Sequence, residues 1–521
     1  MKEIFFALIL CFFSATVLQL NAQEVVELKQ PLSNKVIIKL QFRNGSISDP
    51  KGKEGLTYAT ATTMVRTGTA DKNFRQIQEF IYPMAASFNA SVDKEVTVFT
   101  FAVHQDFLDS FYTVLRGLIL TPSFDEADFN RVKTNQQVYV DQVIRASSDE
   151  DYSKFALEDL LFRGTNYGHM VTGNSAGVTT ITLDDIKQHY KNYFTKDNLS
   201  IGIAGAYTPA FLQKLKSDMS RLPSLQKALP TPAKPASPNG LEVEIISKTD
   251  ALGSAIFAGF PLPITRKDNE FAALMVANSY LGEHRKAYGK LYDKIRTTRS
   301  MNYGDYSYIE WYEGGGQNML PQPGVPRQSN YFSLWIRPVQ VAEGLKQQYT
   351  ELKDIETGHA LFALRLALRE IDQMVTKGLT KEEFEATRRF LRSYNKLYIQ
   401  TPEKQLGFMM DSRFYGRKDY ITEMDALLAK LTLADVNAAI KKYLQTKNMF
   451  VTIVTDDSEA PTLKKALDEK KSTPMSYSNL VKEGLPKSVI AEDEAIARFP
   501  LNAKKVTIVD SKETFKPLKA F

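Results

Sequence analysis

The chain has 521 residues, 43% hydrophobic and 24% charged, which is too long for a single core and ordinary for a folded globular protein. Its formal net charge is only +6, and the lysines and arginines form no basic run. The sequence therefore indicates no nucleic-acid-binding surface, and two or more domains are expected.

The N-terminus has the pattern of a cleavable export signal. Lys2 is followed by an uncharged apolar stretch, residues 4–18, which is short for a membrane span, and Ala22 precedes the expected cleavage before Gln23. The one cysteine, Cys11, lies inside this stretch. The mature chain would then have no disulfide, no catalytic thiolate and no cysteine-based metal site. No later segment is apolar enough to cross a membrane, so we expect a soluble periplasmic protein.

Strand-like and helix-like segments follow one another in the first half. Residues 36–42 and 96–103 predict strands, and 107–120 and 126–146 predict helices. Residues 229–240 contain four prolines and no apolar periodicity, which indicates a semi-rigid linker.

The second half shows the same succession. Predicted strands lie at 255–260 and 331–336, with a further one in the tail at 505–510. Predicted helices lie at 270–281, 286–298, 361–376 and 380–398. Two segments, 124–129 and 379–384, match across the halves, since each places acidic residues in the first turn of a helix.

A long internal repeat organises the chain. Residues 181–205 return 250 positions later as 431–455, with a threonine N-cap, a short helix, an asparagine turn and an apolar strand in each copy. The identical positions are Thr182/Thr432, Leu183/Leu433, Asp185/Asp435, Lys191/Lys441, Tyr193/Tyr443, Asn198/Asn448 and Ile203/Ile453. A repeat at this spacing indicates two large homologous halves.

These observations predict an α+β fold of two homologous lobes, each a mainly antiparallel sheet packed with helices, facing each other as a clamshell. The expected division is a signal peptide at 1–22, a first lobe at 23–228, the linker at 229–240, a second lobe at 241–470 and a tail at 471–521.

The segment from Gly55 to Thr69, with the strand before it, the two-half repeat and Tyr167–Gly173, resembles the pitrilysin/insulinase family of zinc peptidases, which includes mitochondrial processing peptidase. The resemblance covers nearly the whole mature chain. It implies an inverted zinc motif, His-x-x-Glu-His, just after Gly55. Here Tyr58, Ala61 and Thr62 stand at the three functional positions. The glutamate that active members supply as a third ligand is also missing, since this chain has Asn-Gln-Gln-Val-Tyr at 135–139.

The spacing of the histidines, considered without the family resemblance, also indicates that a zinc site is missing. A zinc site on one helix needs two imidazoles about one turn apart, whereas the closest pair of histidines is 20 residues apart. The histidines are His104, His169, His189, His284 and His359. The sequence also contains no Gly-x-Ser-x-Gly elbow and no phosphate-binding loop, and Gly314–Gly316 is expected to be a flexible loop. We therefore expect no metal or cofactor in this chain.

The segment 289–306 resembles the family segment in which an arginine is followed seven residues later by a tyrosine, here Arg296 and Tyr303. The resemblance implies that this pair reaches a zinc site in the other half or in another subunit and stabilises the tetrahedral intermediate. Arg296 at a helix end and Tyr303 on the following strand would let both converge on one carbonyl oxygen. Ser300 replaces the usual glycine. The alternative is an ordinary helix-end cation and a strand aromatic.

Several aromatic residues continue from this pair and are able either to wall a peptide groove or to pack alternately into the core. They are Tyr303, Tyr306, Tyr308, Trp311 and Tyr312.

Two functions from different classes remain open. The first is a non-catalytic subunit of an exported heterodimeric zinc peptidase, whose partner carries the zinc while this chain completes the peptide chamber and donates Arg296 and Tyr303. The second is a peptide-binding or scaffold protein of the same fold without hydrolysis. An active peptidase with unusual ligands ranks last. A peptide is the expected ligand in both main readings.

Overall fold

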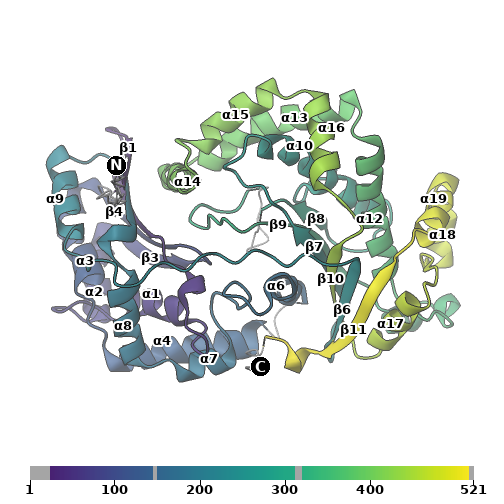
Figure 1. Cartoon of the computed structure of the whole chain (residues 1–521), viewed down its shortest axis with the longest axis horizontal. Coiled ribbons are helices and arrows are strands. Elements are labelled where there is room, and N and C mark those ends of the chain that lie inside the picture. Colours follow the sequence, from purple (N-terminus) through teal and green to yellow (C-terminus); the bar gives the residue numbers. More distant parts are fainter. Residues whose placement is uncertain (1–23, 145–148, 311–319, 516–521) are drawn as a thin grey trace, which may run out of the picture.

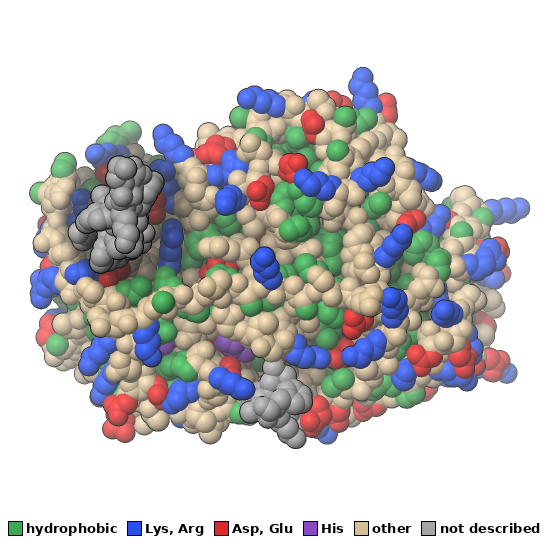
Figure 2. All heavy atoms as spheres, in the orientation of Figure 1, with side chains coloured by type: hydrophobic (Ala, Val, Ile, Leu, Met, Phe, Trp, Pro, Cys, Tyr) green, Lys and Arg blue, Asp and Glu red, His purple; other side chains and the backbone are tan. Residues whose placement is uncertain are grey.

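The computed structural model describes residues 24–144, 149–310 and 320–515. The predicted signal peptide and the glycine loop at 314–316 lie outside the described residues, as do Trp311 and Tyr312. Within the described ranges, no helix is long and apolar enough to span a bilayer. On the face drawn in Figure 2, basic and acidic side chains are interspersed rather than gathered into patches of one sign.

Two sheets form the two lobes seen in Figure 1. The first has the order β1 (Glu24–Lys29), β5 (Leu199–Gly205), β2 (Lys35–Phe42), β4 (Thr97–His104), β3 (Ser87–Val92). The second has the order β11 (Ala503–Asp510), β6 (Leu241–Ser247), β10 (Met449–Thr455), β7 (Ser254–Pro261), β9 (Tyr331–Val339), β8 (Asp305–Tyr308). From β6 onwards the second order repeats the first.

The pairing directions repeat as well. β1 pairs parallel with β5, as β6 does with β10, and the pairs β2–β4, β3–β4, β7–β9 and β8–β9 are antiparallel. The predicted α+β fold of two homologous lobes with mainly antiparallel sheets is therefore confirmed. The predicted tail strand is also present, because β11 pairs parallel with β6 and adds a strand that the first sheet lacks.

Helices pack around both sheets. In the first half they are α1 (Leu56–Arg66), α2 (Phe74–Ile81), α3 (Leu108–Leu120), α4 (Glu126–Val138), α6 (Asp149–Phe162), α7 (Ser175–Thr180), α8 (Leu183–Tyr193) and α9 (Pro209–Met219). In the second half and tail they are α10 (Phe271–Gly282), α11 (Ala342–Gln348), α12 (Ala360–Lys377), α13 (Lys381–Tyr394), α14 (Pro402–Phe414), α15 (Tyr420–Lys430), α16 (Leu433–Tyr443), α17 (Ala460–Asp468), α18 (Asn479–Gly484) and α19 (Lys487–Ala497).

One predicted helix is wrong in extent. The helix expected at 286–298 is reduced to a short π-helical segment, Tyr292–Thr297, preceded by two helical residues, Lys290 and Leu291. Arg285 adopts the left-handed region at φ 54°, and two tight turns carry the chain from Glu283 to Gly289. A left-handed residue followed by turns cannot continue a right-handed helix, so the regular segment starts late.

The two repeat frames form the same local structure. α8 and α16 each begin with a capping box, in which a threonine hydroxyl accepts from the N3 backbone N–H and the N3 aspartate accepts from the threonine N–H. The pairs are Thr182 with Asp185 and Thr432 with Asp435. Identical capping explains why these positions match across 250 residues.

One helix from each half packs on the sheet of the other half. α6 packs on β7 and β10, where Leu157, Leu161 and Phe162 join a buried cluster with Phe257 and Trp335. In the opposite direction, α14 packs on β5 and β1 through Leu406 and Met410. Figure 1 shows α6 and α14 between the two lobes. The lobes of the clamshell are thus joined by exchanged helices as well as by the linker.

A buried ion-pair network fastens the same junction. The Arg327 guanidinium, from the second half, donates to Asp93 at 2.7 and 2.8 Å and to Glu158 at 2.9 Å. Lys94 Nζ lies 2.6 Å from the other oxygen of Glu158. These four side chains are at most 5% exposed. Because the buried charges of the first half are neutralised only when Arg327 of the second half is in place, the network favours one fixed arrangement of the lobes.

The boundaries proposed at 228 and 241 are testable by cutting the linker. We expect that a site-specific protease sequence inserted after the exposed Lys227 will be cleaved, and that the two fragments will then co-elute on size exclusion, because α6 and α14 hold them together. Denaturing electrophoresis should show the two fragments apart. Separate elution under native conditions would contradict the exchanged-helix arrangement.

Candidate functional site

The helix that matches the zinc-binding segment of active relatives is α1, and Tyr58, Ala61 and Thr62 stand there at the three functional positions. Tyr58 and Thr62 are half-buried, and Ala61 is buried in the core. Gly55 begins the helix at φ 98°, a conformation that favours glycine. Gln136 of α4 donates its amide to Gly55 O at 3.0 Å and to Thr172 O at 2.9 Å. The region expected to lack the third ligand therefore supplies a neutral hydrogen-bonding side chain that ties α4 to the start of α1.

Asp49 fixes the first turn of α1 from the other side. Its carboxylate is fully buried and accepts from Gly55 N–H and Thr57 N–H at 2.7 Å each and from the Thr57 hydroxyl at 2.6 Å. His169 Nε2 lies 3.1 Å from the same carboxylate. Sequence reasoning missed Asp49, because it lies six residues before the N-cap Gly55, outside the position at which a capping side chain is recognised in a sequence.

The remaining histidines are also engaged in local contacts. His189 Nε2 lies 3.0 Å from Thr57 Oγ1, and burial lowers the pKa of His189 to about 4. His284 Nδ1 lies 2.5 Å from the Tyr308 hydroxyl, and burial lowers its pKa to about 3. Within the described ranges, no group of three His, Cys, Asp or Glu side chains is placed to hold a metal ion.

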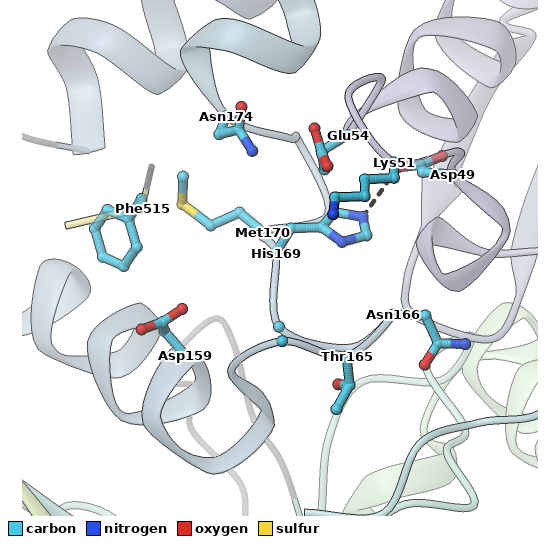
Figure 3. Close-up of a pocket in the computed structure, with 12 residues that line it drawn as sticks. Asp49, Lys51, Glu54, Asp159, Thr165, Asn166, His169, Met170, Asn174 and Phe515 are labelled. Atoms are coloured by element: carbon cyan, nitrogen blue, oxygen red, sulfur yellow. Dashed lines mark hydrogen bonds and ion pairs between the residues drawn. The ribbon is translucent and has the colours of Figure 1, made fainter. Parts of the chain in front are cut away.

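A cavity of about 320 Å³ lies beside the start of α1 (Figure 3). Its wall includes Glu54, Lys51 and His169 near the helix, Asp159 from α6, and Phe515 from the tail. In Figure 3 the His169 ring points toward Asp49, its hydrogen-bond partner. Charges of both signs line this cavity, and among its lining residues we find no nucleophile hydrogen-bonded to a base.

Arg296 and Tyr303 are brought together in the second half. The Arg296 guanidinium lies over the rings of Tyr292 and Tyr303, 5.0 and 5.1 Å from their centroids, and it donates to the Tyr292 hydroxyl and to Tyr303 O at 3.3 Å. Tyr303 is 74% exposed. Two rings against its faces orient the planar guanidinium and leave part of its N–H edge for a ligand.

Two details of this segment differ from the sequence prediction. Tyr303 lies in the turn before β8 rather than on the strand, which explains its exposure. Tyr306 and Tyr308 do lie on β8 and are buried against Trp335 and α6, so for them core packing is correct and a groove wall is wrong. Only Tyr303, of the described members of this aromatic run, faces solvent.

Ser300 occupies the left-handed region at φ 52°, which accounts for the glycine usual at this position. Replacing Ser300 with glycine should remove the side-chain penalty and raise the free energy of unfolding by roughly 0.5–1 kcal/mol. Urea unfolding of both proteins measures the change. As a matched control, Ser220→Gly on the exposed end of α9, where the backbone is right-handed, should be neutral or destabilising. Equal effects of the two substitutions would contradict the strain at Ser300.

The side chains at Tyr58 and Thr62 also predict the metal content. The mature chain, purified without a tag, should contain no stoichiometric zinc, because neither side chain replaces an imidazole and Gln136 is already bonded to backbone carbonyls. Elemental analysis after dialysis checks this. About one zinc per chain would contradict it.

Comparisons with known proteins agree with this geometry. Residues 24–173 match the family described as Insulinase (Peptidase family M16), and residues 180–391 match the Peptidase M16 inactive domain. A Helicobacter pylori protein named "Non-peptidase homolog YmxG" is 22% identical over 470 residues, covering 88% of this chain and 99% of the relative. A probable mitochondrial-processing peptidase subunit beta of Arabidopsis thaliana is 26% identical over 230 residues, covering 43% of this chain and 42% of that protein.

Solved structures show the same fold. A crystal structure of a peptidase M16 inactive domain from Pseudomonas fluorescens superposes with a TM-score of 0.70 at 18% identity, covering 84% of this chain and 96% of that one. A structure described as a protease from Helicobacter pylori gives a TM-score of 0.67 at 15% identity, with 84% and 97% coverage.

Proposed function

Because this chain belongs to the insulinase (M16) peptidase family and lacks the family's zinc motif, we propose that it is the non-catalytic subunit of an exported, heterodimeric zinc metallopeptidase. A partner subunit of the same family carries the zinc and the general base. This chain, exported to the periplasm, completes the peptide chamber and donates Arg296 and Tyr303 to the substrate carbonyl. It holds no cofactor of its own.

The single observation that supports this role most is that, within the described ranges, the charge of Arg296 is not paired with a carboxylate. Among the described side chains, no carboxylate forms an ion pair with its guanidinium, although most arginines of the second half have such a partner. Together with the exposed Tyr303 hydroxyl, it is a donor set suited to an oxygen that becomes negative in the transition state.

The surroundings of the pair favour action on a partner. The groove that Arg296 and Tyr303 line is built entirely from second-half and tail residues, and α1 of the same chain contributes none. A zinc site completed by this pair would then belong to another chain, which is the reason for proposing a heterodimer rather than a single-chain enzyme.

An open sheet edge supports binding of a peptide. β3 pairs only with β4, so its other backbone edge is unpaired within the described residues, and it packs beside α1. An extended peptide is able to add to such an edge through main-chain hydrogen bonds. This feature serves either proposed function.

A second candidate is a catalytically inert peptide-binding or scaffold protein. The Helicobacter pylori relative, which matches along 99% of its length, is named a non-peptidase homologue. The open edge of β3 would suffice for that role, and Arg296 would then bind a peptide without any hydrolysis.

A pull-down from the native periplasm separates the two candidates. The mature chain with a C-terminal tag is expressed in its own host, and bound proteins are identified by mass spectrometry. We expect a stoichiometric M16 relative that carries His-x-x-Glu-His, and zinc-dependent peptide hydrolysis in the eluate. Recovery of a homodimer alone, or of a partner without the zinc motif, would favour the scaffold.

A further inference from the structure

A groove of about 560 Å³ adjoins Arg296 and Tyr303, and the C-terminal tail forms one of its walls. The other walls come from the segment 296–303, from the end of β9 and α11, and from His359. Its apolar and aromatic members include Met301, Leu345, Tyr349, Met475, Tyr477 and Val481. The tail is thus part of the surface on which the Arg/Tyr pair acts.

The tail wall is held in place before any ligand arrives. The Tyr477 hydroxyl donates to Asp493 at 2.8 Å, and the other oxygen of Asp493 accepts from Arg299 Nε at 2.7 Å. His359 Nε2 lies 3.0 Å from Ser476 O. A preformed wall costs little ordering entropy on binding, as is usual for ligand sites.

The groove carries uncompensated positive charge. No aspartate or glutamate lines it among the described residues. Arg299 is fully buried and neutralised by Asp493 and Glu492, whereas Arg296 has no carboxylate partner there.

The acidic residue nearest to Arg296 in the sequence is Asp293, which does not line the groove. The next one along the chain is the buried Asp305. It accepts from the Asn302 amide at 2.8 Å, and burial raises its pKa well above the usual range. Burial therefore disfavours the charged form of Asp305.

We propose that this groove receives an apolar side chain of an extended peptide, on a residue next to the carbonyl bound by Arg296 and Tyr303, and that it rejects lysine and arginine. The inference rests on the proposed function and names its substrate class. Val481 is 44% exposed and Tyr303 74%, so both present apolar surface that a ligand side chain would cover. A basic side chain would instead meet Arg296, and none of the described residues that line the groove is an acid able to neutralise it.

The test is a specificity switch in the mature, full-length chain. Binding of a fluorescent positional-scanning peptide library, measured by anisotropy, should show one position at which leucine is preferred over lysine by about 10-fold or more, which corresponds to roughly 1.4 kcal/mol. Val481→Asp places a carboxylate in the groove and should shift that ratio toward lysine by about 10-fold or more. Leu480→Asp is the matched control: it is the neighbouring residue, 82% exposed and not a lining residue, and it should leave the ratio unchanged.

The inference is overturned if no position discriminates, if Val481→Asp and Leu480→Asp behave alike, or if no peptide binds at concentrations up to about 1 mM, because the groove is complete within this chain. These failures are distinct from failure of the subunit role. If Val481→Asp changes the side-chain preference but the chain captures no zinc-bearing partner, the groove proposal stands and the heterodimer proposal fails. If an active heterodimer is recovered but Val481→Asp leaves the preference unchanged, the heterodimer proposal stands and the groove proposal fails.

Discussion

Tyr303→Phe should lower the turnover of the proposed two-subunit peptidase, once reconstituted, by about 10²–10³-fold while the complex still assembles. The substitution removes only a hydroxyl, and Tyr303 is 74% exposed, so the fold of the chain does not depend on it. A tetrahedral intermediate places negative charge on the former carbonyl oxygen, and a donor aimed at that oxygen stabilises it more than the neutral ground state. The loss should therefore appear in kcat more than in KM.

Arg296→Ala should cost at least as much and also weaken peptide binding, because the charged fork is removed and Tyr303 loses the cation beside its ring. Tyr82→Phe is the control, because it also removes only a hydroxyl, from a first-half tyrosine that is 87% exposed. It should leave the turnover unchanged. Peptide hydrolysis with assembly checked by size exclusion separates the outcomes. Wild-type rates for both variants in an intact complex would make the pair structural, and loss of activity only through loss of assembly would make it an interface.

The parts of the fold that sequence reasoning predicted are those encoded over short distances. Thr182 and Asp185, or Thr432 and Asp435, are three residues apart, so a capping box is visible in the chain itself. The tail strand is visible for the same reason, since its alternation is local even though its partner, β6, lies far away.

The parts that escaped prediction depend on distant contacts. The ion pair between Arg327 and Asp93 joins residues 234 positions apart, and neither residue carries a local signal for its partner. The exchange of α6 and α14 follows from which sheet each helix meets, which the helix sequence alone does not encode. For the site, the spacing of Arg296 and Tyr303 suggested convergence, but the stacking on Tyr292 and the tail wall of the groove required the fold.

The largest expected effect on stability concerns the buried network at the lobe junction. Arg327→Met keeps much of the side-chain volume but leaves Asp93 and Glu158 without their shared cation, in positions 1% and 5% exposed. Removing one partner of a buried ion pair leaves an uncompensated charge, and the free energy of unfolding should fall by roughly 3–5 kcal/mol. Arg392→Met, which breaks the exposed pair with Asp425, should cost less than about 0.5 kcal/mol. Urea unfolding at neutral pH measures both.

The pH dependence identifies the cause of that loss. Burial alone would raise the pKa of Glu158, but Lys94 and Arg327 outweigh burial and hold it below the ordinary value, so the wild type loses this stabilisation as the pH falls through that lowered pKa. In Arg327→Met the pKa of Glu158 should rise, because burial is then opposed by Lys94 alone, and acid should relieve the buried charge. The stability gap between the two proteins should therefore be widest near neutral pH and narrow as the solution is made acidic. A gap that is constant with pH would assign the loss to packing, and a gap below about 1 kcal/mol at neutral pH would show that the junction does not depend on this network.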